Sequence, residues 1–173
     1  NWNSVPQNQG FLKSLFGGQQ GIDLDLGCLY ELKNGQKGAV QALGNSFGSL
    51  TRPPYMSLDG DDRTGAAAAG ENLRINGNQI ANIKRVLVYT FIYEGVANWQ
   101  QADATVTIKY PGAEDLIVKM DSYNSSEKMC ALALLENVND ETFSVEKIVQ
   151  FYGGHALMDK AFHWGLNWKP GRK

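Results

Sequence analysis

Apolar residues occupy every second position of residues 22–32, and this is the clearest repeating pattern in the chain. They are Ile22, Leu24, Leu26, Cys28, Tyr30 and Leu32. A period of two predicts a β-strand with one buried face. The opposite face carries Asp23, Asp25 and Glu31. We therefore expect Asp23 and Asp25 to face outward, at the end of the strand near the loops.

Turn residues and short apolar stretches divide the rest of the chain. Asn34-Gly35 is typical of a tight hairpin and predicts a second strand through Ala39, Val40 and Leu43. Further strand patterns lie at residues 72–75, 85–93, 104–110, 116–121, 129–136 and 143–152. Many short strands separated by turns predict an all-β fold. We expect a β-sandwich of two mainly antiparallel sheets.

Two further stretches refine this fold. Leu157, Ala161 and Trp164 recur at helical spacing, so the sandwich should carry one or two short helices, one of them here. Tyr89, Phe91 and Tyr93 alternate along a β-branched and aromatic strand, and we expect them to pack in the core rather than to form a stacking platform.

Two segments lack a regular pattern. Residues 1–20 are mixed in composition and predict an N-terminal arm or linker, whose apolar run at residues 11–16 we expect to dock elsewhere. Residues 44–70 are rich in Gly, Ser and Pro and predict a long loop. Unstructured loops of this length in compact domains usually carry function. The domain itself is expected to span residues 21–173.

Composition narrows the class of protein. The chain has 173 residues, enough for one domain with its own core. Its net charge of -2 argues against a nucleic-acid binder, which would carry a basic patch. The sequence has no apolar run long enough to cross a bilayer and no recognisable secretory leader. We expect Cys28 and Cys130, which lie in apolar stretches, to be buried free thiols.

The most promising chemistry lies within the long loop. Residues 58–65 read Leu-Asp-Gly-Asp-Asp-Arg-Thr-Gly, with three carboxylates within four positions. Carboxylates and loop carbonyls are the oxygen ligands that calcium prefers. The stretch does not fit an EF-hand, because Arg63 and Gly70 stand where ligands would be needed. It predicts either a calcium site assembled from several loops or a solvated acidic turn.

Other kinds of site are less well supported. His155 and His163 have no cysteine or carboxylate at zinc spacing, so surface or packing roles are expected. The sequence contains neither a Gly-x-Ser-x-Gly nucleophile turn nor a phosphate-binding loop. The residues therefore give no support for an enzyme that uses either of these motifs.

Three stretches together resemble a known family. They are Gly-Ile-Asp-Leu-Asp-Leu at residues 21–26, Gly-Asp-Asp-Arg-Thr-Gly at 60–65, and the strand at 85–93 followed by Glu94. In this combination they resemble the TerD family of bacterial tellurium-resistance and stress-response proteins. The resemblance covers roughly residues 21–168. It is strongest to a branch in which the module lies within a longer chain, which would account for a start at Asn1 rather than Met.

The resemblance implies a β-sandwich with calcium-binding loops at one end and no established enzymatic activity. By position, it implies metal ligands at Asp23, Asp25, Asn45, Asp61, Asp62 and Glu71. It also implies work in a tellurite-resistance or stress complex with other proteins. The expected location is cytoplasmic, peripheral to the inner membrane, with no membrane insertion and no nucleic-acid partner.

One departure from the family bears on the metal. Where the family continues with an acidic run, this chain has Ala66, Ala67, Ala68 and Ala69 before Gly70 and Glu71. Fewer carboxylates imply weaker calcium binding, or none. Three alternatives therefore stay open. They are a module that binds only protein partners, a carbohydrate-binding sandwich that uses exposed aromatic residues such as Trp99, and a metal-dependent enzyme.

Overall fold

The computed structural model describes residues 23–59, 71–95, 97–102 and 104–171. The predicted arm at 1–20 and most of the acidic stretch therefore lie outside the described residues. The strands are β1 (Asp23–Leu32), β2 (Lys37–Gln41), β3 (Gly48–Ser49), β4 (Met56–Leu58), β5 (Leu73–Ile75), β6 (Ile83–Glu94), β7 (Thr105–Ile108), β8 (Leu116–Lys119), β9 (Met129–Val138) and β10 (Thr142–Tyr152). Short helices are the 3₁₀ turns η2 (Gly77–Asn82) and η3 (Met120–Ser122), with α1 (Trp99–Ala102) and α2 (His155–Ala161).

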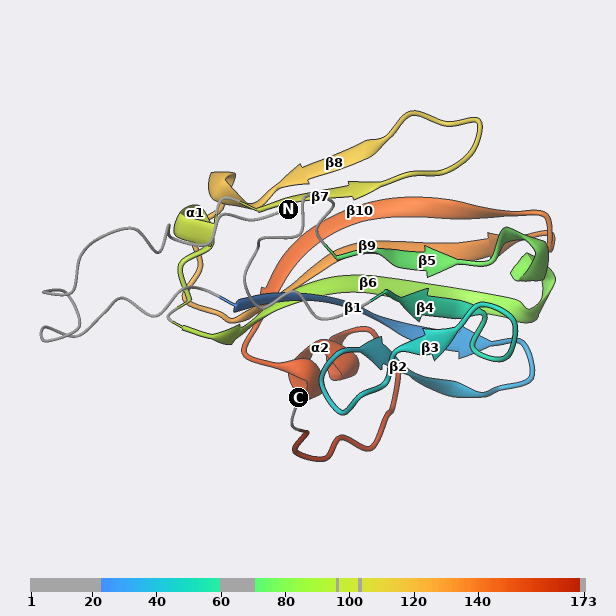
Figure 1. The fold of residues 1–173 in the computed structure, drawn as a ribbon, viewed down its shortest axis with the longest axis horizontal. Helices are drawn as coiled ribbons and strands as arrows, with labels where there is room; N and C mark the ends of the chain where they lie inside the picture. The colour runs from blue at the N-terminus through green and yellow to red at the C-terminus, as the bar shows by residue number, and fades with distance from the viewer. Residues whose placement is uncertain (1–22, 60–70, 96, 103, 172–173) are drawn as a thin grey trace, which may run out of the picture.

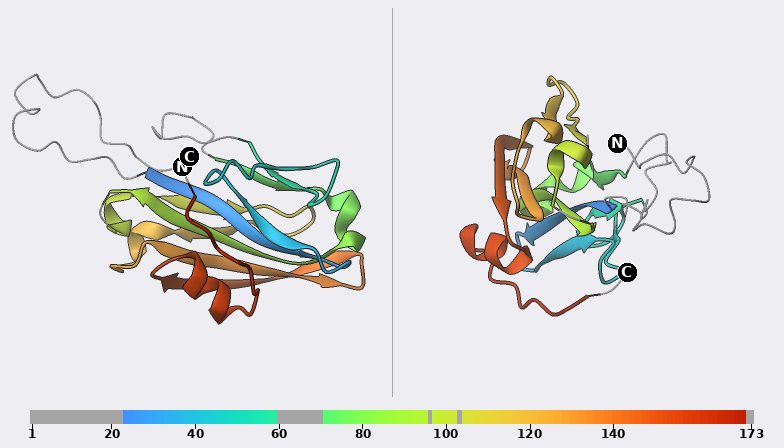
Figure 2. Two further views of the ribbon diagram at one scale, coloured as in Figure 1. Left: turned by 90° about the horizontal axis from the view of Figure 1, so that it is seen from below. Right: turned by 90° about the vertical axis from the view of Figure 1, so that its left-hand side faces the viewer.

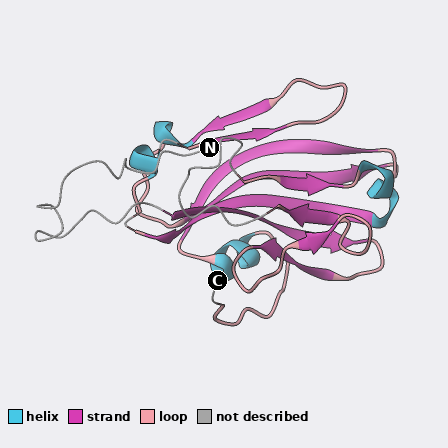
Figure 3. Ribbon diagram, viewed as in Figure 1, coloured by secondary structure: helices cyan, strands magenta, loops and turns pink. Residues whose placement is uncertain are grey.

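The long strands form one antiparallel sheet in the order β10-β9-β6-β1-β2. A second layer covers one face and consists of a three-stranded sheet, β3-β4-β5, and the hairpin β7-β8. Helix α2 and the chain after it lie on the opposite side of the large sheet (Figures 1 and 2). The predicted β-sandwich with short helices is confirmed, as the predominance of strand in Figure 3 illustrates.

Strand β1 shows why the large sheet is buried on both faces. Leu24, Cys28 and Leu32 are buried in the core between the two strand layers, as their period predicts. Leu29, on the opposite face of β1, is also fully buried, in a second core shared with Met158 of α2 and with Trp164.

The outward orientation expected for Asp25 is therefore wrong. Asp25 is 0 % exposed. An alternating pattern of apolar residues shows which side chains share a face of the strand. It does not show whether a distant segment of the chain covers that face. On this face of β1, Leu29 is covered by Met158 and Trp164, more than 100 positions further along the chain.

Three other expectations need correction. The long loop contains the strands β3 and β4, which were too short to give a pattern. Trp99 is only 1 % exposed and donates its Nε1–H to the carbonyl of Glu127, so it is not an exposed aromatic ligand for sugars. Leu157 is 59 % exposed, and the buried apolar residue of α2 is Met158 instead.

Other expectations are confirmed. Cys28 and Cys130 are buried free thiols, and burial raises the pKa of each to about 12. Tyr89 and Phe91 lie in the second core. Within the described residues, no helix is long and apolar enough to cross a membrane.

Two glycines of the large sheet lie directly beneath tyrosine rings. Gly27 pairs across strands with Tyr89, and a Cβ built on Gly27 would lie 2.7 Å from the ring. Gly38 pairs with Tyr30, and a Cβ there would lie 2.5 Å from the hydroxyl oxygen. Each ring covers the backbone where its partner has no side chain, so both sites require glycine while the tyrosine keeps its place.

Candidate functional site

The two ends of the acidic stretch are joined by a carboxylate clamp. The backbone N–H of Asp59 donates to the Asn72 carbonyl at 3.1 Å. In return, the Asp59 carboxylate accepts the backbone N–H of Asn72 at 2.8 Å, its side-chain amide at 2.9 Å and Arg74 Nη1 at 3.1 Å. Residues 60–70 therefore begin and end at one place, at the start of β5.

These contacts explain the acidity of Asp59. Partial burial alone would raise its pKa, but the hydrogen bonds from Asn72 and the charge and hydrogen bond of Arg74 lower it below its usual value. Asp59 is ionised at neutral pH and serves to hold the backbone. Its role was missed in the sequence, where it appeared only as the first of three neighbouring acids.

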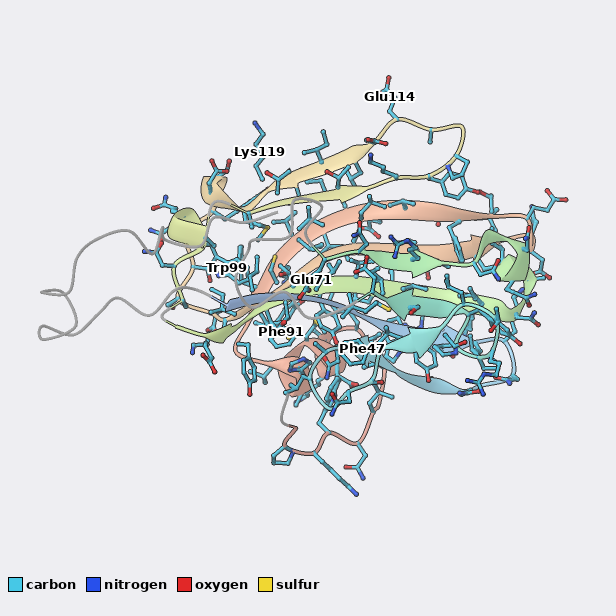
Figure 4. All side chains as sticks on the ribbon, in the orientation of Figure 1. Phe47, Glu71, Phe91, Trp99, Glu114 and Lys119 are labelled. Carbon is cyan, nitrogen blue, oxygen red and sulfur yellow. The ribbon has the colours of Figure 1, made fainter. Side chains whose placement is uncertain are left out.

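Glu71 connects this clamp to the large sheet. Its Oε2 accepts the backbone N–H of Leu26 at 2.8 Å. The pairing of β1 with β2 ends at Gly27, so Glu71 supplies the acceptor that the next residue of β2 would otherwise provide. Glu71 lies beside β1 in Figure 4, whereas Glu114 projects from the turn between β7 and β8.

Asp25 is adjacent in sequence to the residue that Glu71 holds. Its carbonyl accepts the hydroxyl of Thr90 at 2.8 Å, and its Cα partner on β6 is Phe91. The structure thus brings two of the predicted ligand residues, Asp25 and Glu71, to the same end of β1.

The structure does not join the other predicted ligands to Asp25 and Glu71. Asp23 is the first residue of β1 and pairs with Glu94 through the backbone. Asp61 and Asp62 lie outside the described residues. Asn45 is exposed in the turn after β2, with a φ of 55° and its N–H donated to the carbonyl of Ala42. The contacts described for Asn45 join it to neither Asp25 nor Glu71.

The described residues do not complete a metal site by themselves. Among them, no group of three or more His, Cys, Asp or Glu side chains is placed to hold a metal ion. Calcium takes six to eight oxygen ligands, so Asp25 and Glu71 could supply only part of its shell. A complete site would need Asp61 and Asp62, which follow Asp59 by two and three positions.

A second polar cluster, also missed in the sequence, lies on the α2 side of the sheet. The Oε1 atom of Gln41 accepts the Tyr89 hydroxyl at 2.5 Å and lies 2.9 Å from Nε2 of His155. The ring of His155 contacts Phe91 and Trp168 at centroid distances of 4.9 and 4.8 Å. Burial lowers the pKa of His155 to about 4, so its ring is neutral at pH 7 and donates from Nε2 to Gln41.

Comparison with known proteins identifies the class of fold. No family model matches the chain. The structure is similar to that of a homologue of telluride resistance protein TerD from Streptomyces coelicolor, with a TM-score of 0.62 and 14 % identity, covering 91 % of this chain and 89 % of that one. A solved protein of unknown function has a TM-score of 0.61 and 14 % identity, covering 88 % and 86 % of the two chains. The fold is that of the TerD-like proteins.

The sequence identifies the branch. All 173 residues are similar to the tellurium resistance protein TerA of an Alcaligenes species, at 42 % identity. The chain is thus similar to TerA over its whole length and to TerD homologues in fold, and the resemblance found in its motifs is confirmed. It spans about half of that relative, 51 % of its length.

Proposed function

We propose that this chain is a non-enzymatic, calcium-binding-type module of a bacterial tellurite-resistance or chemical-stress complex. The observation that carries the proposal is the hydrogen bond from Leu26 N–H to Glu71, 2.8 Å long, beside the buried Asp25. It joins Glu71, the first described residue after 60–70, to the acidic end of β1. Two segments that are 45 residues apart in the sequence thus converge at this end of the sandwich.

The residues that would hold calcium follow from this convergence. Asp61 and Asp62 would supply carboxylates from the loop, with Asp25 or Asp23 from β1, and Glu71 through the oxygen not bonded to Leu26. Asn45 is the least supported of the set, because its described contacts lie within its own turn. With alanine at 66–69, the site has few carboxylates, so we expect weaker binding than at a site with the full acidic run.

The positions of the side chains whose pKa values are shifted favour a role without catalysis. Burial raises the pKa values of Cys28, Cys130 and Tyr89. All three side chains are 0 % exposed, in the packed cores rather than in a cleft. His155 is engaged with Gln41 and aromatic rings. Perturbed titratable groups that are buried in packing mark structure more than chemistry.

The partners and location belong to the same proposal. We expect the module to bind other proteins of the resistance complex on the cytoplasmic side of the inner membrane, peripherally and without insertion. A second candidate is a module that has lost calcium and acts only through protein contacts. It is favoured by the incomplete ligand set among the described residues.

Calcium titration separates the two candidates. The melting temperature would be measured against calcium concentration for the parent, for Asp61→Ala and for the matched control Glu114→Ala. A ligand that binds only the folded state stabilises it by RT ln(1 + [L]/Kd). We expect calcium to raise the melting temperature of the parent and of Glu114→Ala, and to have a smaller effect on Asp61→Ala.

Two results would change the proposal. An equal rise in all three proteins would remove Asp61 from the ligand set. No rise in any of them at millimolar calcium would favour the module that acts only through its protein partners.

A further inference from the structure

The second layer of the sandwich is split between β5 and β7. Within the described ranges, β5 pairs only with β4, and β7 pairs only with β8. The three residues of β5 and the four residues of β7 nevertheless line one and the same cavity, of about 860 Å³. The inner edges of two strands therefore border a single groove.

The floor of this groove is mostly apolar and belongs to the large sheet. Its apolar residues come from β1, β6, β9 and β10, and they are Leu24, Leu26, Val88, Leu135, Phe143 and Val145. Asp25 and Thr90 of the same sheet also line the cavity. An occupant of the groove would thus rest on the main core, with strand edges on both sides of it.

The backbone of β5 presents hydrogen-bonding groups to the groove. Asp59 N–H donates to the Asn72 carbonyl and Asn76 N–H donates to the Tyr55 carbonyl, so residues 72 and 76 direct their backbone groups toward the β4 side. Because backbone groups alternate in direction along a strand, those of Leu73 and Ile75 point away from β4, into the groove.

Strand β7 does the same from the other side. Met120 N–H donates to the Ala104 carbonyl, which directs residues 104, 106 and 108 toward β8. The backbone groups of Thr107 therefore point to the edge of β7 that β8 does not cover. An apolar floor between two such edges fits an extended peptide, which can bond on both sides, better than a small molecule.

We propose that this groove accepts an extended strand and that the strand is the chain's own segment around residues 11–16. The segment reads Phe-Leu-Lys-Ser-Leu-Phe, with four apolar residues and one charge. Inserted between β5 and β7, it would join the two parts of the second layer into one sheet. The inference does not depend on calcium binding.

The connection to β1 is long enough for this placement. The segment leads through residues 17–22 to Asp23, and Leu24 and Leu26 of the same strand line the groove. Six residues span up to about 20 Å when extended. That is longer than the four-residue strand β7, which extends about 13 Å.

A strand makes a testable demand on side-chain spacing. Phe11 and Leu15 would share one face, and Leu12 and Phe16 the other, because side chains alternate. Only one of these pairs can rest on the apolar floor. If the segment is a strand, replacing one of these pairs should reduce its binding in the groove much more than replacing the other.

The test is amide hydrogen exchange by NMR on the full chain. It compares the parent with Phe11→Asp/Leu15→Asp, with Leu12→Asp/Phe16→Asp and with the matched polar control Ser4→Asp/Asn8→Asp. The diagnostic amides are those of Leu73, Ile75 and Thr107, and the internal references are Arg74 and Val106, which point to β4 and β8. We expect the diagnostic amides of the parent and of the control to be protected. One of the two apolar double variants should exchange at least tenfold faster at these amides, while the references stay protected.

Three results would overturn the proposal. The diagnostic amides could exchange freely in the parent, which would mean that no strand pairs there. Protection could persist in both apolar variants, which would assign the groove to another part of the chain. Protection that rises with protein concentration would assign it to a second copy.

Discussion

The carboxylate of Glu71 accepts the backbone N–H of Leu26 across 45 residues of sequence, at 2.8 Å. This contact fixes the end of the acidic stretch to β1 beyond the point where β2 stops pairing. Replacing Glu71 with Ala should lower the free energy of unfolding by about 1–3 kcal/mol, because a charged acceptor is lost and a strand N–H is left unpaired. Urea denaturation in calcium-free buffer measures the loss.

Glu71→Gln and Glu114→Ala serve as controls for this experiment. The amide oxygen of Gln still accepts a hydrogen bond, so its loss should be smaller. Glu114 is exposed in the turn between β7 and β8, so its removal should change stability little. Equal losses for Glu71→Ala and Glu114→Ala would contradict a structural role for the Leu26 contact.

His155 should make stability depend on pH between about 6.5 and about 4. Burial lowers its pKa from 6.5 to about 4, so in this window the unfolded chain binds a proton that the folded chain does not. The free energy of unfolding should therefore fall as pH falls through the window, by on the order of 2–3 kcal/mol. Denaturation of His155→Asn should lack this part of the pH slope.

His163→Asn is the matched control for this pH effect. His163 is exposed and has a φ of 53°, a conformation that Asn tolerates well. This variant should keep the full slope of the parent. A slope unchanged in His155→Asn as well would assign the effect to the carboxylates.

Asp159 should be a main organiser of the C-terminal segment. Its carboxylate accepts the backbone N–H groups of Gly165 at 2.8 Å and Leu166 at 3.0 Å, and Trp168 Nε1–H at 3.1 Å. Asp159→Ala should cost roughly 2–3 kcal/mol and red-shift tryptophan fluorescence, because buried donors lose their acceptor. Asp140→Asn removes only an exposed ion pair with Lys33, keeps a residue that tolerates the φ of 64° at this position, and should cost at most about 1 kcal/mol. If the two variants lose the same stability, the Asp159 network is not what holds the segment.

Glu31 should contribute stability that disappears in acid. Burial alone would raise its pKa, but hydrogen bonds from Lys84 and Arg85, with the charges of Arg85 and Lys37, lower it below 4.5. The contribution is present above the unfolded pKa and is lost as pH falls through the folded one. Glu31→Gln should cost roughly 2–3 kcal/mol at pH 7 and much less near pH 3, as measured by denaturation at both values. Exposed Glu146→Gln should show little difference at either pH.

The sequence predicted the long strands well because their information is local. β1, β6, β9 and β10 carry enough alternating or β-branched residues to set their own pattern. β3 and β4 have only two and three residues, too few for any period. They owe their structure to pairing with each other and, for β4, with β5. No local signal could have found them.

The candidate site was predictable in its residues but not in its contacts. Glu71 and Asp25 were expected together, and the structure brings both to one end of β1. The burial of Asp25 could not be foreseen, because the alternating pattern of β1 does not show that its second face is covered as well. Likewise, nothing near His155 in sequence indicates that Gln41 and Tyr89 lie beside it.

The two glycines beneath tyrosine rings bear on how this domain can change over evolutionary time. A side chain at Gly27 would overlap the ring of Tyr89, and one at Gly38 would overlap the ring of Tyr30, so neither glycine can be replaced while its tyrosine keeps its place. A lineage that gains a side chain at position 27 must shrink residue 89 in the same step or soon after. Related sequences should therefore show correlated residues at each pair of positions. Where one position has glycine, its partner can be tyrosine, and where it has a larger residue, its partner should be smaller. Such correlated replacement would record the register of β1 against β6 and β2 without any structure.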